Sequence, residues 1–168
     1  MVRTTTRNEG LEDPLLTSVG LFVEAHAGLS VAAERLLAAQ GLSSQWFDVL
    51  LRLVRTPGQR LRMSDLAAQT TLSASGLTRV VDRLVAEGLA RREACPSDRR
   101  GFFAVLTPAG EKAVLAALPT HVRHLEEVLG AAFDAQELDT FTTLMRRLRD
   151  VVNPDAERAS RPGTCDDA

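Results

Sequence analysis

The hydrophobic pattern of this chain is helical over most of its length and changes to a period of about two directly after Gly88. Residues 89–94 and 102–106 form two short alternating runs, and the polar segment between them is typical of a turn. The chain holds six Phe, one Trp and no Tyr, so Leu, Val and Ala must build the core, which favours helices. The sequence therefore predicts a mainly helical fold with one small β-hairpin.

Apolar residues at helical spacing, bounded by capping residues, predict six helices. Ser64 is expected to cap the third helix, and Thr107 followed by Pro108 the fifth. Asp134 and Glu137 have the spacing of a capping box at the start of the sixth. The predicted helices begin near residues 15, 44, 65, 73, 108 and 134.

Charge is distributed unevenly along the chain, although the formal net charge is only −2. Ten arginines stand against five acidic residues between Arg52 and Arg100, so the flanks are net acidic. This predicts a basic module held between helical segments. The expected division is a disordered N-terminus at 1–10, a helical dimerisation region at 11–41 and 107–152, a DNA-binding domain at 42–106, and a disordered tail at 153–168.

Helix, short turn, helix and hairpin follow one another inside the basic module, which is the order of a winged helix-turn-helix. Such a recognition helix buries one face and presents small or hydrogen-bonding residues to DNA. The inward stripe of the fourth predicted helix is Leu77, Val80 or Val81, Leu84 and Val85. Its expected DNA-contacting residues are Ser73, Ser75, Gly76, Thr78, Arg79 and Arg83.

The turn of the predicted hairpin carries Arg99 and Arg100. A guanidinium at such a wing tip can enter a narrow minor groove, and Asp98 is placed to orient one of the two arginines. A charge cluster of this kind, taken alone, is more often a solvated turn. Its position after a helix-turn-helix favours a contact with DNA.

Short motifs along the chain resemble the MarR (multiple antibiotic resistance regulator) family. They are Leu-Ser-Ser-Gln at 42–45, Leu-Ala at 66–67, Leu-Thr-Arg-Val-Val-Asp-Arg-Leu at 77–84, Gly-Leu at 88–89, Asp-Arg-Arg at 98–100 and Leu-Thr-x-x-Gly at 106–110. The match extends over residues 15–152. The resemblance implies a winged helix-turn-helix in an intertwined, obligate homodimer joined by the first, fifth and sixth helices. It also implies a regulator, typically a repressor, that binds pseudo-palindromic operators and releases them when a small-molecule effector binds.

Apolar residues outside the basic module support a homodimer independently, because they need partners. They could instead form one intramolecular core, but a two-fold protein matches a two-fold DNA site. These residues are Leu16, Val19, Val122, Leu125, Leu144, Leu148 and Val151.

Phe22, His26 and Trp46 are candidates for an effector pocket between the first two helices, where relatives bind small aromatic compounds. A Trp at this place is more often simply part of the core. Two alternatives to an effector remain open. Cys95 lies beside four arginines and is a candidate redox sensor, or else a small exposed turn residue. His121 and His124 are candidate ligands of a sensed metal, or else part of an exposed or interfacial helix face.

The remaining classes of function are disfavoured. The sequence has no phosphate-binding glycine loop, nucleophile elbow or metalloprotease helix, so no catalytic residue, metal site or cofactor is expected. A pure scaffold would leave the arginine-rich wing without a role. No apolar stretch is judged long enough for a signal peptide or a membrane span, so a cytoplasmic protein with no membrane partner and two free thiols, Cys95 and Cys165, is expected.

Overall fold

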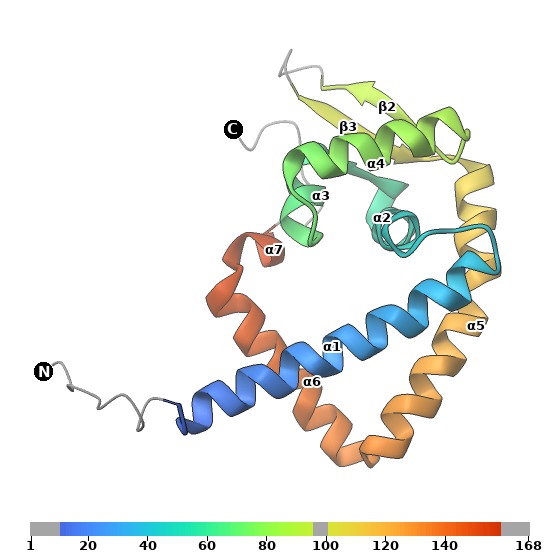
Figure 1. Cartoon of the computed structure of the whole chain (residues 1–168). Coiled ribbons are helices and arrows are strands. Elements are labelled where there is room, and N and C mark those ends of the chain that lie inside the picture. Colours follow the sequence, from blue (N-terminus) through green and yellow to red (C-terminus); the bar gives the residue numbers. More distant parts are fainter. Residues whose placement is uncertain (1–10, 96–100, 159–168) are drawn as a thin grey trace, which may run out of the picture.

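A computed structural model describes residues 11–95 and 101–158 (Figure 1). The elements along the chain are α1 (Pro14–Ala38), α2 (Ser44–Arg55), a 3-10 turn η1 (Pro57–Gln59), β1 (Arg60–Arg62), α3 (Met63–Gln69), α4 (Ala74–Ala86), β2 (Ala90–Ala94), β3 (Phe102–Leu106), α5 (Pro108–Ala132), α6 (Ala135–Val152) and α7 (Pro154–Arg158). The mainly helical fold with a small β-wing is confirmed, and β1 and α7 are elements that the sequence did not predict. We call residues 42–106 the head and helices α1, α5 and α6 the frame.

The head has a continuous apolar core. Helix α2 contributes Leu50 and Leu53, and α3 contributes Leu66, all of them fully buried. Helix α4 buries Leu77, Val80, Val81 and Leu84 against them, while Val85, which the sequence places inside, is 38% exposed. Each fully buried Leu or Val contributes about 1.5–3 kcal/mol, so the head has a substantial core within one chain.

The wing is a three-stranded antiparallel sheet with the strand order β1-β3-β2. Leu61 of β1 and Arg92 of β2 both pair with Ala104 of β3. The sequence reads as a polar link around residues 59–62 because arginines flank Leu61. That side chain is nevertheless buried, and the buried Leu61 explains why β1 joins the sheet.

A tight junction connects the wing to α5. Thr107 is the N-cap of α5, as predicted, and its side chain accepts a hydrogen bond from the Gly110 backbone N–H. The Thr107 hydroxyl also donates to the Gly88 carbonyl at 2.7 Å. A Cβ atom built on Gly110 would lie 2.0 Å from the Leu89 carbonyl oxygen. The Leu-Thr-x-x-Gly step at 106–110 therefore requires glycine for close packing of α5 against the start of β2.

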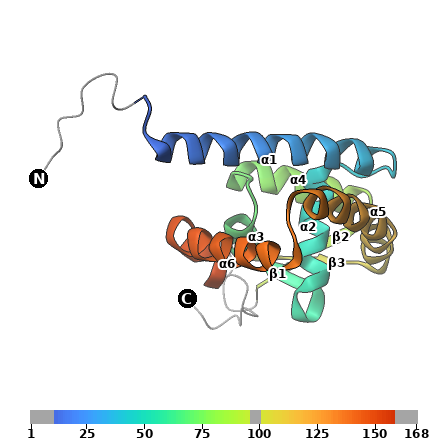
Figure 2. The ribbon, with the colours of Figure 1, turned by 90° about the horizontal axis from the view of Figure 1, so that it is seen from below.

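Helix α1 lies along one edge of the molecule (Figure 2) and packs through its C-terminal part on α2 and α5. At this corner the Glu34 carboxylate accepts a hydrogen bond from the Ser44 backbone N–H at 2.9 Å. Hydrogen bonds from Ser44 lower the pKa of Glu34. The carboxylate thus complements the positive N-terminal end of α2.

Most of α1 is not covered by residues 11–95 and 101–158, since Leu37 is the one residue of this fully described helix that is buried. By length and composition α1 could cross a membrane, with a mean hydropathy of 1.5 over an 18-residue window. The expectation that no stretch of the chain meets this criterion was therefore wrong. Two glycines and a few charged residues interrupt the apolar residues of this segment in the sequence. In the helix, the apolar side chains nevertheless form an exposed surface.

Helices α5 and α6 form the remainder of the frame. In Figure 1, α5 runs away from the head, and α6 returns toward it and ends beside α3. The predicted capping box of α6 is present: the Asp134 side chain accepts from the Glu137 N–H, and the Glu137 side chain accepts from the Asp134 N–H. None of the residues of α6, all of which the structure describes, is buried.

Two local expectations were wrong. Helix α3 begins at Met63, so Ser64 lies inside its first turn, and no side chain caps it. The tail expected to be disordered from residue 153 instead forms α7 at its start, where Ala156 is only 7% exposed. Residues 1–10 and 159–168, predicted to be disordered, lie outside the described residues.

Candidate nucleic-acid interface

The start of α4 is shaped for close approach to a ligand. The Ser73 hydroxyl accepts from the Gly76 N–H at 3.2 Å and lies 3.3 Å from the Ser75 hydroxyl. A Cβ on Gly76 would lie 3.1 Å from the Ser73 oxygen, so a larger residue would crowd the cap. Ser73 and Ser75 are exposed, and the helix presents its N-terminal end to solvent as the sequence predicts.

The exposed face of α4 carries Thr78, Arg79 and Arg83. The Thr78 hydroxyl donates to the Ala74 carbonyl at 2.9 Å, and Arg79 Nε donates to the Ser75 carbonyl at 3.3 Å. These bonds hold both side chains along the helix. The structure thus brings together on one surface all six α4 residues singled out from the sequence.

Arg92 of β2 connects the wing to α4. Its Nη2 lies 3.0 Å from the Asp82 carboxylate and 3.5 Å from the Thr78 carbonyl oxygen. The Arg92 side chain is about one-third exposed, so a charge on the wing strand is held against the solvent face of α4. In Figure 1 the hairpin and α4 lie at the same end of the molecule, away from the turn between α5 and α6.

Two further arginines lie on the sheet. The Arg60 guanidinium carbon is 4.0 Å from the centre of the Phe103 ring, and that of Arg62 is 5.8 Å from it. Arg60 also pairs with Glu93 at 3.9 Å, and Glu93 pairs with Arg91. Sequence analysis missed Arg60, Arg62 and Arg92 as site residues. The local basic charge was the available signal, but pairing of β1 with β3 is not encoded locally.

A cavity of about 460 Å³ lies where the wing, α3 and α4 meet. Its lining combines two guanidinium groups with two hydroxyls and apolar side chains. The lining residues are Arg62, Met63, Ser64, Thr78, Arg92, Gly101 and Phe102. Arg62 and Arg92 thus bring part of the basic charge of the head beside α4. Asp98, Arg99 and Arg100 of the predicted wing tip lie outside the described residues.

The three candidates for an effector pocket have different environments. Phe22 and His26 lie one turn apart on the exposed part of α1, with Phe22 49% exposed. Trp46 is half-buried and packs against the core of the head. None of the three side chains lines the cavity between the wing, α3 and α4, and none lines a second cavity of about 430 Å³ beside Phe133 and Phe141.

Cys95 directly follows β2 and is buried, so the alternative that it is a small exposed turn residue is wrong. It is 4% exposed and packs with Phe103 and Val105. Its Sγ accepts from Arg62 Nη2 at 3.7 Å. This burial restricts the access of an oxidant, so the structure adds nothing in favour of a redox role.

His121 and His124 lie on the inner side of α5. The His121 ring is 4.8 Å from the Phe47 ring, centre to centre. His121 Nδ1 and His124 Nε2 are buried without a hydrogen-bond partner in the described part of the chain. Burial lowers the pKa of His121, and the charge of His124 lowers it further. Within residues 11–95 and 101–158, no group of three metal-ligating side chains forms.

Comparisons of the sequence and of the structure with known proteins point to the same family of regulators. Residues 40–101 match the sequence profile of the MarR family. The chain is 31% identical to the transcriptional regulator HosA of Escherichia coli O111:H- over 108 residues, covering 64% of this chain and 77% of HosA. It is 27% identical to the transcriptional repressor MprA of Escherichia coli K12 over 114 residues, covering 68% of this chain and 64% of MprA.

The fold is similar to that of a solved regulator bound to DNA. The crystal structure of Sco3205, a MarR family transcriptional regulator from Streptomyces coelicolor, in complex with DNA matches at a TM-score of 0.73 with 30% identity. This match covers 89% of the present chain and 91% of Sco3205, so it includes the frame as well as the head.

Proposed function

The chain belongs to the MarR family of DNA-binding transcriptional regulators, and from this premise we propose that it is a homodimeric repressor that binds a pseudo-palindromic operator and is released by a small-molecule effector. The observation that carries the DNA-binding part is the joint surface of α4 and the wing. It combines an exposed helix N-terminus with at least three arginines, Arg79, Arg83 and Arg92. Such a surface fits the edges and phosphates of duplex DNA.

The residues proposed to bind DNA divide into two groups. Ser73, Ser75, Gly76 and Thr78 allow α4 to approach the major groove, where Arg79 and Arg83 contact base edges or phosphates. Asp98, Arg99 and Arg100, which lie between β2 and β3 in the sequence, are the residues proposed to contact the backbone or the minor groove. The strand residue Arg92 contacts Asp82 and Thr78 of α4 and adds a further positive charge beside the first group.

The homodimer is supported by apolar side chains of the frame that are exposed in a single chain. Leu16 is 58% exposed and Leu148 is 46% exposed. Large apolar side chains exposed in such number are typical of an interface. Further exposed apolar residues of the frame are Leu15, Val19, Leu21, Phe22, Val23, Val122, Leu144 and Val151. A second copy that covers α1 explains its hydropathy without a membrane, in keeping with a cytoplasmic protein.

Repression and effector release are the finer parts of the proposal. The similarity to the repressor MprA favours repression. Phe22 and His26 on α1 and Trp46 on α2 are the candidates for effector contacts, and the interface between two copies would enclose the first two. An aromatic ring and an imidazole are suited to a planar, weakly polar ligand.

Footprinting on genomic fragments tests the function directly. We expect two-fold protection with half-sites about one helical turn, roughly 10 bp, apart. Affinity should fall steeply between about 50 and 200 mM salt, because arginine–phosphate contacts release counterions. An asymmetric footprint, or binding that does not respond to salt, would contradict the proposal.

A further inference from the structure

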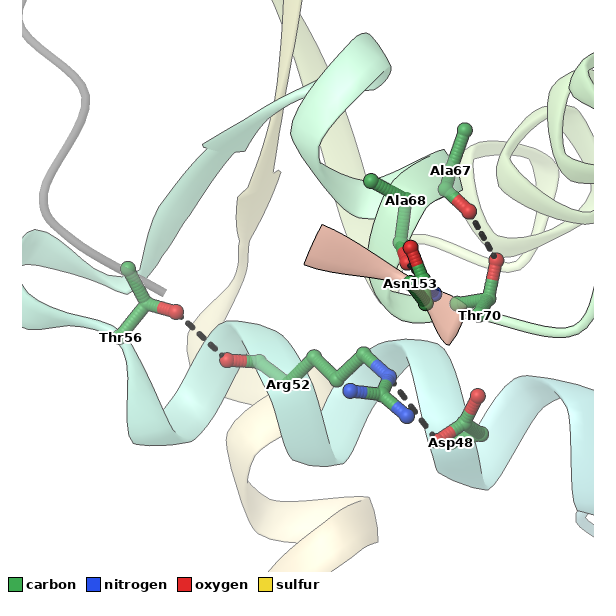
Figure 3. Close-up of polar contacts among 7 residues, drawn as sticks. All are labelled: Asp48, Arg52, Thr56, Ala67, Ala68, Thr70 and Asn153. Carbon is green, nitrogen blue, oxygen red and sulfur yellow. Dashed lines mark hydrogen bonds and ion pairs between the residues drawn. The ribbon is translucent and has the colours of Figure 1, made fainter. Parts of the chain in front are cut away.

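The short helix α7 contacts the head far from its own place in the sequence. Asn153, between α6 and α7, donates from its side-chain amide to the Ala68 carbonyl of α3 at 2.9 Å (Figure 3). The two residues are 85 positions apart, and the bond is partly shielded from solvent. Helix α7 contacts both α3 and α6 beyond this bond, and Ala156 of α7 is buried.

The position of this bond on α3 is significant. The last four carbonyls of a helix have no partner within the helix. The Ala67 carbonyl receives hydrogen bonds from the Thr70 backbone N–H at 3.3 Å and the Thr70 hydroxyl at 3.5 Å. The Ala68 carbonyl receives the Asn153 amide instead. The end of α3 is thus capped partly by its own turn and partly by the end of the frame.

Helix α3 ends where the turn to the recognition helix α4 begins. The direction in which the chain leaves α3 therefore influences the direction of α4. The frame is joined to the head covalently at residues 39–43 and at Thr107, and α7 adds a third connection at the opposite side. Figure 1 shows α7 beside α3, with α6 leading to it from the frame.

We propose that Asn153 and α7 act as a strap that fixes the orientation of the helix-turn-helix on α6, so that Asn153 is a positioning residue for operator binding. The inference rests on the proposed function, because α6 belongs to the frame that joins two copies. With the strap in place, the separation of the two recognition helices in a dimer is restricted. Without it, each head rotates more freely, and the fraction of dimers with the correct separation falls.

The test measures binding to the duplex that the wild-type protein protects, and to versions with one base pair inserted or removed between the half-sites. Asn153→Leu keeps the side-chain size and removes the donor. We expect it to weaken binding to the natural spacing by about 3- to 10-fold, the range of one net hydrogen bond. The variant should lose less affinity for the duplexes with altered spacing. The ratio of its affinities for the natural and the altered spacings should therefore be smaller than that of the wild type. Thr143→Ala, on an exposed part of α6, is the matched control and should behave as wild type.

A purely structural role for Asn153 would lower the melting temperature and weaken all duplexes by the same factor, and that result would overturn the inference. Unchanged affinity and spacing preference would do the same. Ala156→Leu tests α7 in a second way, because it enlarges a buried side chain of that helix. It should also reduce the difference in affinity between the natural and the altered spacings. It replaces Asn153→Leu if that variant does not fold. A wild-type protein without a two-fold site would refute the proposed function as well, whereas wild-type binding with an unaltered variant would refute the strap alone.

Discussion

The head and the frame differ in how much of their apolar surface one chain covers. Helix α4 in the head buries Leu77, Val80, Val81 and Leu84. Helix α6 in the frame is longer, yet none of its residues is buried, and α1 buries Leu37 alone, each helix being described in full. The core of the head is buried within one chain, with Leu37 of α1 and Val114 and Ala117 of α5 packed into it. The rest of α1 and the whole of α6 leave their apolar side chains uncovered. Helices α4 and α6 both have apolar residues at helical spacing, so an apolar stripe does not show by itself whether its partner lies in the same chain.

The largest effect is expected from a variant that disrupts the proposed interface of the frame and leaves the head unchanged. Leu144→Glu with Leu148→Glu places two carboxylates in the proposed interface, where burying a charge without a partner costs several kcal/mol. We expect monomers by light scattering. The helices of the head should remain folded by circular dichroism, because the buried core does not include Leu144 or Leu148. A stable dimer of this variant would move the interface to another surface.

The control variant also places two carboxylates on α6, but on the polar side of the helix, and it additionally removes the positive charge of Arg146. Thr143 and Arg146 are exposed, and helical spacing puts them opposite Leu144 and Leu148. Thr143→Glu with Arg146→Glu should remain dimeric. Loss of the dimer in both variants would point to damage of α6 itself.

The second effect breaks the head. Leu84→Ala removes a fully buried side chain and should lower the free energy of unfolding by about 2–5 kcal/mol. Its neighbour Val85 is 38% exposed, and Val85→Ala should cost less than about 1 kcal/mol. Urea unfolding of the two variants checks the difference. Equal losses would mean that Val85 is covered in the assembled protein.

The third effect distinguishes two parts of the binding surface. Arg79→Ala should cost about 1–3 kcal/mol at the cognate site and relax its preference at one base pair, as loss of a base contact does. Arg100→Ala should weaken cognate and scrambled duplexes by similar factors and lower the salt slope by about one per lost contact. Titrations at several salt concentrations compare the two. A sequence-specific loss for Arg100→Ala would assign base recognition to the wing.

The smallest effect concerns the boundary between head and frame, where His121 of α5 faces Phe47 of α2. Burial and His124 lower the pKa of His121, so the unfolded chain takes up its proton at a higher pH than the folded one. Stability should therefore decrease as pH falls through the ordinary histidine range, about 6.5, toward the lower folded pKa. His121→Gln should show a flatter stability curve, and His124→Gln a smaller change in the same direction. A wild-type curve identical to that of His121→Gln would contradict this.

Local signals explain which parts of the fold were predictable. The Asp134–Glu137 capping box and the Thr107 cap depend on residues three positions apart, and both were predicted correctly. Strand β1 depends on pairing between Leu61 and Ala104, and α7 on a bond from Asn153 to Ala68. Neither pairing is visible in the surrounding sequence. Ser64 was wrongly taken as a cap because a polar residue before an apolar run resembles one.

The candidate site follows the same rule. The exposed residues of α4 could be predicted because their spacing separates them from the buried stripe, and their role in DNA binding stays a prediction. Arg92 was missed because its partners, Asp82 and the Thr78 carbonyl, lie on a different element. Cys95 was expected at the surface because it adjoins a polar turn, but Phe103 of the opposite strand covers it.

The central claim is that two copies complete the frame and present two heads to one DNA site. Sedimentation equilibrium of the wild-type protein, alone and with the protected duplex, tests it most directly. The account predicts a dimer at micromolar concentration and two chains for each duplex. A wild-type protein that is monomeric and binds the duplex as a single chain would contradict it.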